Sequence, residues 1–122
     1  MGMEDRMTII CYPRCGTCRK AEAFLKEHDI PYTYRDIKEA NPTKEELASL
    51  YERSGLPLRR FFNTSGRLYR EHNLKDRLPM MSDDEALELL STDGMLVKRP
   101  ILVTGARVFV GFKEAEWKDL IG

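Results

Sequence analysis

The sequence predicts an α/β fold: a β-α-β unit, a long helical segment, and a β-β-α unit that completes a mixed four-stranded sheet. Near the start of the chain, apolar β-branched runs flank a helical pattern. The middle carries two helix-capping signatures, and the last part returns to β-branched runs before a final helical pattern. Because a β-α-β crossover joins parallel strands and a hairpin joins antiparallel ones, the two units together predict a mixed sheet.

Composition and charge exclude several classes of protein. Apolar residues make up 42% of the 122 residues and charged residues 33%, which is typical of a soluble globular protein. Lys and Arg total 20, as do Asp and Glu, so no net field points to direct nucleic-acid binding or to an anionic membrane. No apolar run approaches the ~20 residues of a membrane span. Three cysteines, an odd number, argue against a secreted disulfide framework, so we expect a cytoplasmic protein.

The length of the chain suits one domain with a single core. We expect residues 1–6, MGMEDR, to be a leader that is disordered or was added in cloning. Residues 7–122 then form a single domain, with a helical insertion over about residues 40–95 between its second and third strands.

The β-α-β unit is predicted at the start of this domain. Met7–Tyr12 is apolar and β-branched, which indicates a short buried strand. Tyr32–Ile37 alternates as a second strand does. Between them, Gly16–His28 is predicted to be a helix because apolar residues recur at the spacing of one helical face: Ala21, Phe24, Leu25 and His28.

The middle of the chain carries two capping boxes, in which a hydroxyl side chain and a glutamate three residues later cap a helix reciprocally. Gly55 suits the end of the first of these helices, and Asp93–Gly94 is predicted to end the second. Short helices are expected between them. The two boxes are Thr43-x-x-Glu46 and Ser82-x-x-Glu85.

The final unit is predicted from three segments. Pro100–Val103 and Arg107–Val110 are apolar and β-branched, and Gly105–Ala106 between them indicates a hairpin turn. Glu114–Ile121 has an apolar face and closes the chain as a helix.

Cys15 and Cys18 form a CxxC motif where the first strand gives way to the first helix. The first turn of a helix exposes unpaired N–H groups and a partial positive charge, which favour a thiolate over a thiol. In such a motif the first sulfur is exposed and the second is more buried. We therefore expect Cys15 to be the nucleophile and Cys18 the resolving thiol.

The alternatives for the CxxC motif are half of a zinc site and two incidental cysteines. Zinc needs four ligands, and the other candidates, Cys11, His28 and His72, lack the usual second-half spacing. We therefore predict redox or nucleophilic chemistry and no metal. Cys11, four residues before Cys15, is interpreted as a small buried hydrophobe.

The motifs along the chain resemble a known family. A CxxC that opens the first helix, with Pro100 directly before the third strand, resembles the thioredoxin fold. The helical insertion is similar to that of the glutaredoxin-coupled arsenate reductases and the Spx-type regulators. The segments that carry this resemblance are PRCGTCRKA, YRDI, FFNTSG, LVKRPILVT and VGFKE.

The resemblance implies a thiol–disulfide redox protein, with a reductase as the favoured interpretation. In the implied cycle, Cys15 attacks an oxidised substrate and Cys18 displaces the product. Glutathione, glutaredoxin or thioredoxin would then restore the dithiol, and no bound cofactor is implied.

The resemblance also implies which arginines serve the site. A cis peptide at Arg99–Pro100 would put Arg99 beside Cys15, where it could stabilise a thiolate or bind an oxyanion. The alternative is a surface arginine paired with a carboxylate. Arg59, or its neighbour Arg60, matches a second arginine of the arsenate reductases, and a solvated helix charge is the alternative for both.

Two departures separate the chain from arsenate reductase proper, which stays an alternative. Those enzymes carry a third arginine where this chain has Val110 and a histidine where it has Cys11. A further alternative is an Spx-like redox-sensing transcription regulator that binds the RNA polymerase alpha subunit. Gly55 occupies the position that matches the polymerase-binding face of those regulators.

Overall fold

The computed structural model describes residues 7–105 and 107–120. The predicted leader at residues 1–6, Ala106 of the predicted turn and Ile121 of the last helix lie outside these ranges. The described residues divide into two compact units. The first unit holds residues 7–36 and 99–120, and the second unit holds residues 37–98.

The first unit contains the predicted mixed sheet. Its strands lie in the order β2-β1-β3-β4, with β1 parallel to β2 and antiparallel to β3, and with β3 antiparallel to β4. The α/β class and the mixed four-stranded sheet are thereby confirmed. The elements of this unit are β1 (Thr8–Cys11), α1 (Gly16–Glu27), β2 (Thr33–Asp36), β3 (Ile101–Val103), β4 (Val108–Val110), α6 (Glu114–Trp117) and η4 (Lys118–Leu120).

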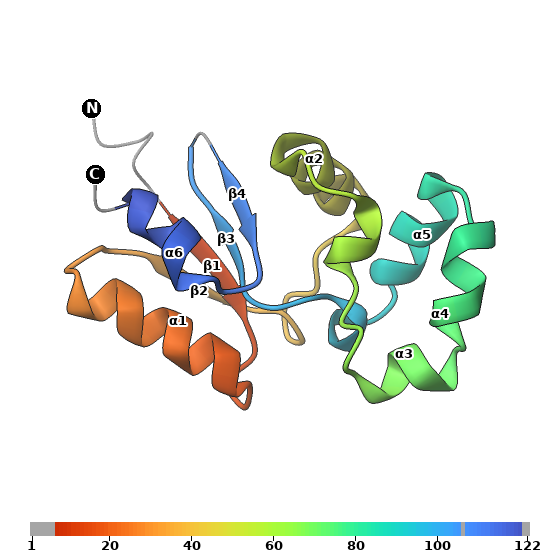
Figure 1. Ribbon diagram of the computed structural model, residues 1–122, viewed down its shortest axis with the longest axis horizontal. Coiled ribbons are helices and arrows are strands. Elements are labelled where there is room, and N and C mark those ends of the chain that lie inside the picture. Colours follow the sequence, from red (N-terminus) through yellow and green to blue (C-terminus); the bar gives the residue numbers. More distant parts are fainter. Residues whose placement is uncertain (1–6, 106, 121–122) are drawn as a thin grey trace. The chain divides into compact units, whose positions relative to one another are not determined.

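Helices α1 and α6 cover the same face of this sheet (Figure 1). Alternation along the strands turns Ile9 and Cys11 of β1 toward these helices, together with Leu102 of β3 and Phe109 of β4. Trp117 fills the centre of this core, fully buried, with edge-on ring contacts to Phe24 and Phe112.

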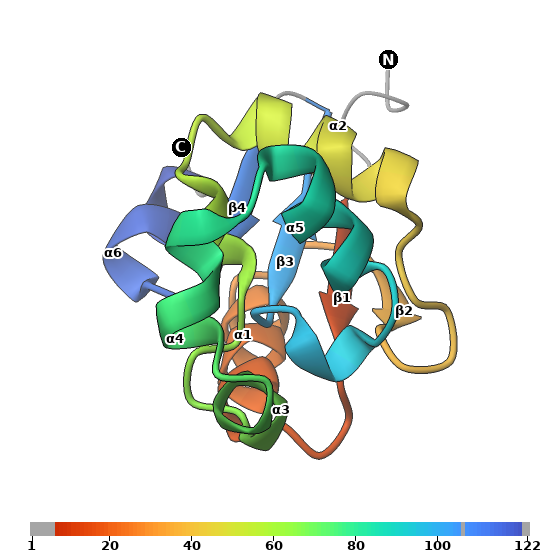
Figure 2. The same cartoon turned by 90° about the vertical axis from the view of Figure 1, so that its right-hand side faces the viewer.

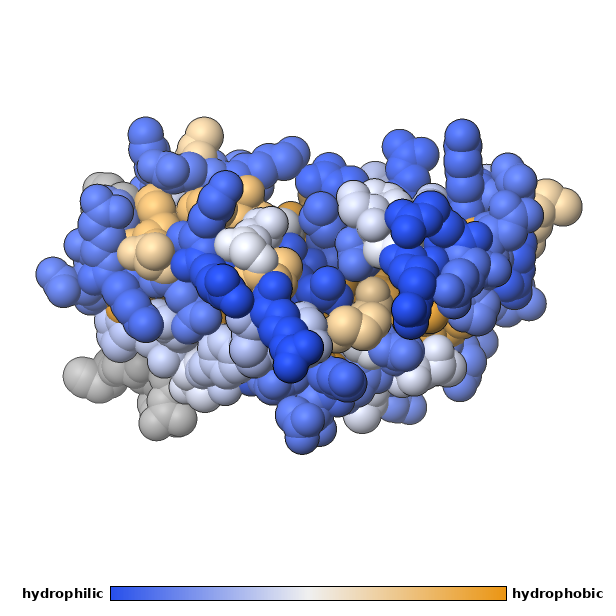
Figure 3. All heavy atoms as spheres, turned by 90° about the horizontal axis from the view of Figure 1, so that it is seen from below, coloured by the Kyte–Doolittle hydropathy of each residue, from blue (hydrophilic) through white to orange (hydrophobic). Residues whose placement is uncertain are grey.

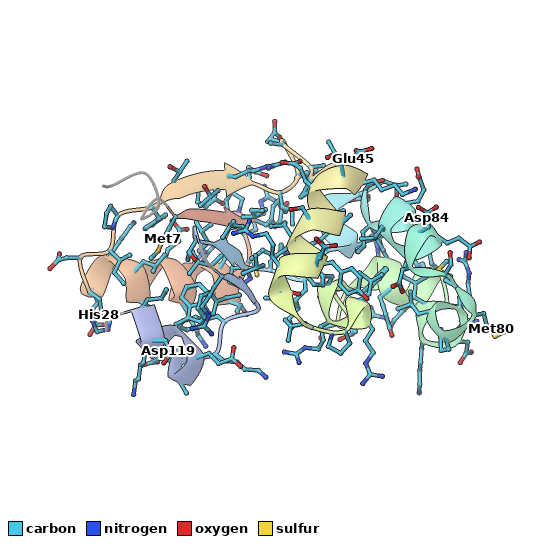
Figure 4. The ribbon with its side chains drawn as sticks, turned by 90° about the horizontal axis from the view of Figure 1, so that it is seen from above. Met7, His28, Glu45, Met80, Asp84 and Asp119 are labelled. Carbon is cyan, nitrogen blue, oxygen red and sulfur yellow. The ribbon has the colours of Figure 1, made fainter. Side chains whose placement is uncertain are left out.

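One residue of the predicted face of α1 does not lie in the core. Ala21, Phe24 and Leu25 are buried, whereas His28 is exposed at the C-cap. Figure 4 shows His28 at the end of α1, and its ring contacts the Phe24 ring at a tilt of 56°, with centroids 4.5 Å apart. The prediction for His28 was wrong because the helix ends at Glu27, one residue before the fourth position of the stripe.

The second unit is helical throughout its named elements (Figure 2). Both capping boxes are present: the Thr43 hydroxyl accepts from the Glu46 N–H at 3.1 Å, and Ser82 does the same for Glu85 at 3.1 Å. Gly55 ends α2 in the left-handed conformation, as predicted. The elements are α2 (Lys44–Ser54), η1 (Leu58–Phe61), α3 (Arg67–Glu71), α4 (Leu74–Arg77), η2 (Leu78–Met80), α5 (Asp83–Leu90) and η3 (Gly94–Leu96).

Asp93–Gly94 does not end α5, and this prediction was wrong. The helix stops at Leu90. The Asp93 carboxylate instead accepts from the Met95 N–H at 2.8 Å and caps η3. Gly94 lies against the backbone of Ile37, which leaves no room for a side chain. The glycine therefore serves a close approach between the first and last parts of the second unit.

Charged residues hold the exposed sides of α2 and α5 together. Lys44 pairs with Asp84 at 2.8 Å and with Glu88 at 3.4 Å. Figure 4 shows Glu45 and Asp84 near the starts of these helices.

On the face seen in Figure 3, hydrophilic side chains predominate and apolar atoms form small separate spots. Within the described ranges, no helix combines the length and the apolar character that crossing a bilayer requires.

Candidate active site

The CxxC motif is positioned by the end of β1 and the first turn of α1. Strand β1 ends at Cys11, and the chain turns through Tyr12, Pro13 and Arg14. The Cys15 N–H donates to the Tyr12 carbonyl at 3.0 Å, which closes this turn. Cys15 is then the N-cap of α1 with extended backbone angles, φ −89° and ψ 121°.

The three cysteines differ in their exposure to solvent. All three are free, with Cys15 half-buried and Cys11 and Cys18 buried. The exposed fraction is 0% for Cys11 and 1% for Cys18. Both belong to the core of the first unit, and Cys15 packs against its edge. An accessible first sulfur and a buried second sulfur form the arrangement expected of a nucleophile and its resolving thiol.

The surroundings of Cys18 lower its pKa. A hydrogen bond with Cys11 is the main influence that lowers the pKa of Cys18, from the ordinary 9.0 to about 7. The Tyr12 backbone N–H, 3.5 Å from Cys18 Sγ, acts in the same direction, as do Cys15 and the charge of Arg99. Burial opposes them, because a charged sulfur loses solvation.

Cys11 is the partner that sequence reasoning missed. It is a buried core residue, as interpreted, but its thiol also hydrogen-bonds to Cys18. This bond and burial raise the pKa of Cys11 far above its ordinary value, so Cys11 keeps its proton. One signal was available in the sequence. Alternation places Ile9 and Cys11 on one face of β1, the face that α1 must cover.

Arg99 also lies at this site. The Arg99–Pro100 peptide bond is cis, the geometry that the resemblance implied. The guanidinium stands 5.7 Å from the centre of the Tyr12 ring, within cation–π range. The Pro100 carbonyl accepts from the Gly111 N–H at 2.8 Å, which ties this junction to the end of β4. The structure thus groups Arg99 with Cys15 and Cys18 in one unit.

Arg59 belongs to the second unit, so its role at the thiols stays a prediction. It lies exposed on η1 and lines a hollow of about 230 Å³ with Leu58 and Phe62. Arg60, its alternative, is exposed on the same short helix. Val110, where the arsenate reductases carry an arginine, is buried in β4 and offers no charge.

No metal centre is found among residues 7–105 and 107–120. Within these ranges, no group of three or more His, Cys, Asp or Glu side chains is arranged so that it could hold a metal ion. The functional groups that the structure brings together in the first unit are three thiols, the Arg99 guanidinium and the backbone N–H of Tyr12.

A thioredoxin-like sheet with a CxxC dithiol at its first helix defines the class: a thiol redox protein. The chain belongs to the ArsC family, whose model matches residues 11–120. That match covers both units, from the last residue of β1 to the end of η4.

Relatives of the chain include regulators. The uncharacterized protein YusI of Bacillus subtilis is 55% identical over 93% of this chain and 96% of its own length. The regulatory protein MgsR of Bacillus subtilis is 32% identical over 93% of this chain and 89% of its own. The global transcriptional regulator Spx of Staphylococcus aureus is 32% identical over 90% of this chain and 82% of its own.

Solved structures place the same fold among arsenate reductases. An ArsC family related protein from Bacteroides fragilis matches with a TM-score of 0.92 and 48% identity, over 98% of this chain and 99% of its own. An arsenate reductase from Vibrio cholerae matches with a TM-score of 0.77 and 30% identity, over 85% of this chain and 87% of its own. The predicted arsenate reductase/Spx family is thereby confirmed.

Proposed function

We propose that this chain is a thiol–disulfide reductase of the cytoplasm. Cys15 attacks one sulfur of a substrate disulfide, so that a mixed disulfide forms and the other substrate sulfur leaves as a thiolate. Cys18 then attacks Cys15 Sγ, which forms the Cys15–Cys18 disulfide and releases the second substrate thiolate. Each departing thiolate takes a proton from water, and the dithiol has supplied two electrons.

One observation carries this proposal: the accessible Cys15 at the N-cap of α1 stands one helical turn before a buried Cys18 whose pKa is lowered to about 7. A resolving thiol with that pKa is half ionised near neutral pH, where the attack on Cys15 must occur. A cysteine placed only for packing would have the opposite property, because burial alone raises the pKa of a thiol.

The reductant is proposed on chemical grounds. Restoring the Cys15–Cys18 dithiol takes two electrons from another thiol, and glutathione, glutaredoxin and thioredoxin are donors of this kind. A cycle of this type needs a compartment that keeps thiols reduced, which supports a cytoplasmic location. No bound cofactor takes part.

Turnover of a glutathione mixed disulfide tests the proposal directly. The wild-type chain is mixed with the substrate and with glutathione, alone or with glutaredoxin or thioredoxin, and product thiol is followed. We expect Cys15→Ser to abolish turnover and Cys18→Ser to accumulate a glutathione adduct on Cys15, visible by mass spectrometry. Full turnover by Cys15→Ser would refute the proposal.

Arsenate reduction proper is a second candidate, supported by the likeness to the Vibrio cholerae arsenate reductase. Against it stands Val110, a buried apolar residue where those enzymes place an arginine. A hydrogen bond to a charged group contributes about 1.5–3 kcal/mol, so an oxyanion would be held less firmly. The same turnover panel with arsenate as substrate distinguishes the two reductases.

A redox-sensing regulator is the third candidate, supported by the 32% identity to MgsR and Spx. In this case the thiols would report oxidation, and the contact with the RNA polymerase alpha subunit would involve the surface around the exposed Gly55 at the end of α2. Pull-down with the alpha subunit, before and after oxidation of the dithiol, tests it. Binding that depends on oxidation in wild type and not in Cys15→Ser would favour the regulator.

A further inference from the structure

We propose that Tyr12 is a positioning residue: its ring holds the Arg99 guanidinium beside the dithiol, where that charge favours substrates with an anionic group near the reacting sulfur. This inference rests on the proposed disulfide exchange and adds a substrate preference to it. The exchange itself uses only Cys15 and Cys18, so Tyr12 contributes through its neighbours.

The backbone of Tyr12 contacts both residues of the dithiol. Its N–H donates to Cys18 Sγ at 3.5 Å. Its carbonyl accepts from the Cys15 N–H at 3.0 Å. These two contacts fix the point from which the Tyr12 side chain starts.

The ring of Tyr12 contacts the Arg99 guanidinium. Arg99 Cζ stands over the ring, 5.7 Å from its centre. The face of an aromatic ring carries negative charge density, so it attracts a cation within about 6 Å. Both residues are half-buried, and a cation–π contact strengthens as water is removed from it. The ring therefore restrains where the guanidinium lies.

Arg99 also has its backbone anchored. The carbonyl of the next residue, Pro100, accepts from the Gly111 N–H at 2.8 Å, which ties the segment before β3 to the end of β4. An arginine side chain can take many rotamers, and holding it in one of them costs conformational entropy. The contact with the Tyr12 ring offsets part of that cost.

The charge of Arg99 acts on the dithiol. It is among the influences that lower the pKa of Cys18, which agrees with a guanidinium held near the sulfurs by Tyr12. A positive charge beside a nucleophilic sulfur raises the local concentration of anionic reactants and leaves that of neutral reactants unchanged.

Other cations lie near the same turn. Arg14 and Arg19 are exposed, and Arg19 Nε donates to the Pro13 carbonyl at 3.3 Å. Exposed charges are screened by salt, so variants must be compared at one ionic strength. Both arginines are unchanged in every variant of the test, and differences between variants therefore report Tyr12 and Arg99.

Alkylation of Cys15 by two reagents of different charge tests the inference without turnover. Iodoacetate is an anion and iodoacetamide is neutral, and the Cys15 thiolate displaces iodide from either reagent to form a thioether. Both reactions need the same thiolate, so the ratio of their rate constants is independent of its ionised fraction. Greater access to the sulfur raises both rates together. Mass spectrometry of the peptide that carries Cys15 follows each reaction in the reduced chain.

We expect Arg99→Gln to lower the ratio of the iodoacetate rate constant to the iodoacetamide rate constant. Tyr12→Leu keeps apolar bulk without a ring and should lower the ratio by about two- to fivefold, the factor that corresponds to a cation–π contact that solvent still reaches. Tyr12→Phe keeps the ring and should keep the wild-type ratio. In the Arg99→Gln background, Tyr12→Leu should lower the ratio no further, because the two residues act through one contact.

Arg107 provides a matched control in the same unit. Its guanidinium stands 4.4 Å from the centre of the Phe109 ring, which is the same kind of contact. Arg107 directly precedes β4, whose first residue pairs with the end of β3 beside the start of β1. The dithiol follows the other end of β1, so Arg107→Gln should leave the ratio unchanged.

An unchanged ratio in folded Tyr12→Leu would overturn the inference, as would an equal fall in the Arg99→Gln background. If Tyr12→Leu does not fold, Tyr12→Phe decides: the wild-type ratio supports the ring contact, and a lowered ratio overturns it. The alkylation ratio does not depend on turnover. A chain without reductase activity whose ratio depends on Tyr12 would therefore refute the proposed reductase while the positioning of Arg99 stands.

Discussion

Gly94 offers a sharp test of how the second unit is closed. It lies in η3, near the end of that unit, against residues from its beginning. A Cβ added to Gly94 would overlap the Ile37 carbonyl oxygen and would lie 2.8 Å from Asn41 Oδ1. The obstacle is backbone, which cannot rotate away, so Gly94→Ala must push apart the first and last parts of the unit.

The magnitude follows from two opposing effects. Forcing extra atoms into a packed site costs about 1–3 kcal/mol, and an obstacle made of backbone places this site at the upper end. Replacing glycine reduces the freedom of the unfolded chain, which returns about 0.4–1 kcal/mol. We expect the free energy of unfolding to fall by about 2 kcal/mol.

Gly66→Ala is the matched control in the same unit. Its Cβ would lie 2.7 Å from Asn63 Nδ2, a side-chain atom held by one long hydrogen bond to the Met95 carbonyl at 3.5 Å, and 3.3 Å from the Asn63 carbonyl oxygen. The obstacle is therefore milder than at Gly94, where the nearest atom is backbone. Urea denaturation of the two variants and wild type gives the comparison, with equal m-values showing that the unfolded state is unchanged. A Gly94→Ala variant as stable as wild type, or no worse than Gly66→Ala, would refute the reasoning.

Three further predictions concern the helix caps, the arginine and pH. Thr43→Ala and Ser82→Ala remove the reciprocal caps of α2 and α5. In urea denaturation, each substitution should lower the free energy of unfolding by about 1 kcal/mol. Unchanged stability would contradict a stabilising role for the capping boxes. Arg99→Gln removes a charge that lowers the pKa of Cys18, so thiolate absorbance in the Cys15→Ser background should move to higher pH; an unmoved midpoint would count against this. Because the native pKa of Cys18, about 7, lies below the ordinary 9.0, the native state binds fewer protons than the unfolded state. The stabilisation by ionised Cys18 is therefore complete above pH 9 and is lost as pH falls through about 7. In wild type, the free energy of unfolding should rise with pH between about 7 and 9, and Cys18→Ala should flatten this rise.

Much of the fold could be predicted because local signals and tertiary structure agree. The apolar run of β1 is buried, and both capping boxes form as their spacing indicates. Gly55 takes the left-handed conformation for which glycine is suited. Helix α1 ends one residue earlier than predicted and β3 begins one residue later. The last predicted helix, Glu114–Ile121, differs more, because its α-helical part ends at Trp117 and a 3-10 turn, η4, follows.

Local patterns fall short where contacts distant in the sequence decide. Asp93–Gly94 has the composition of a helix end, yet Gly94 is needed where the chain passes close to Ile37. Cys11 has the composition of a core residue, yet its hydrogen bond with Cys18 depends on how α1 packs on β1. The division of the chain at Asp36 and Arg99 likewise rests on contacts that no local pattern records.

Trp117 gives the first unit a built-in optical probe. It is the one tryptophan of the sequence, and residues 37–98 contain none. Its ring is fully buried against Phe24 and Phe109, so its emission should shift to the red when this core is exposed to water. Circular dichroism reports the helices of both units. If the emission and dichroism midpoints coincide on denaturation, the sheet and the helical insertion unfold as one cooperative body. If the dichroism changes first, the insertion unfolds while the core that carries the thiols stays folded.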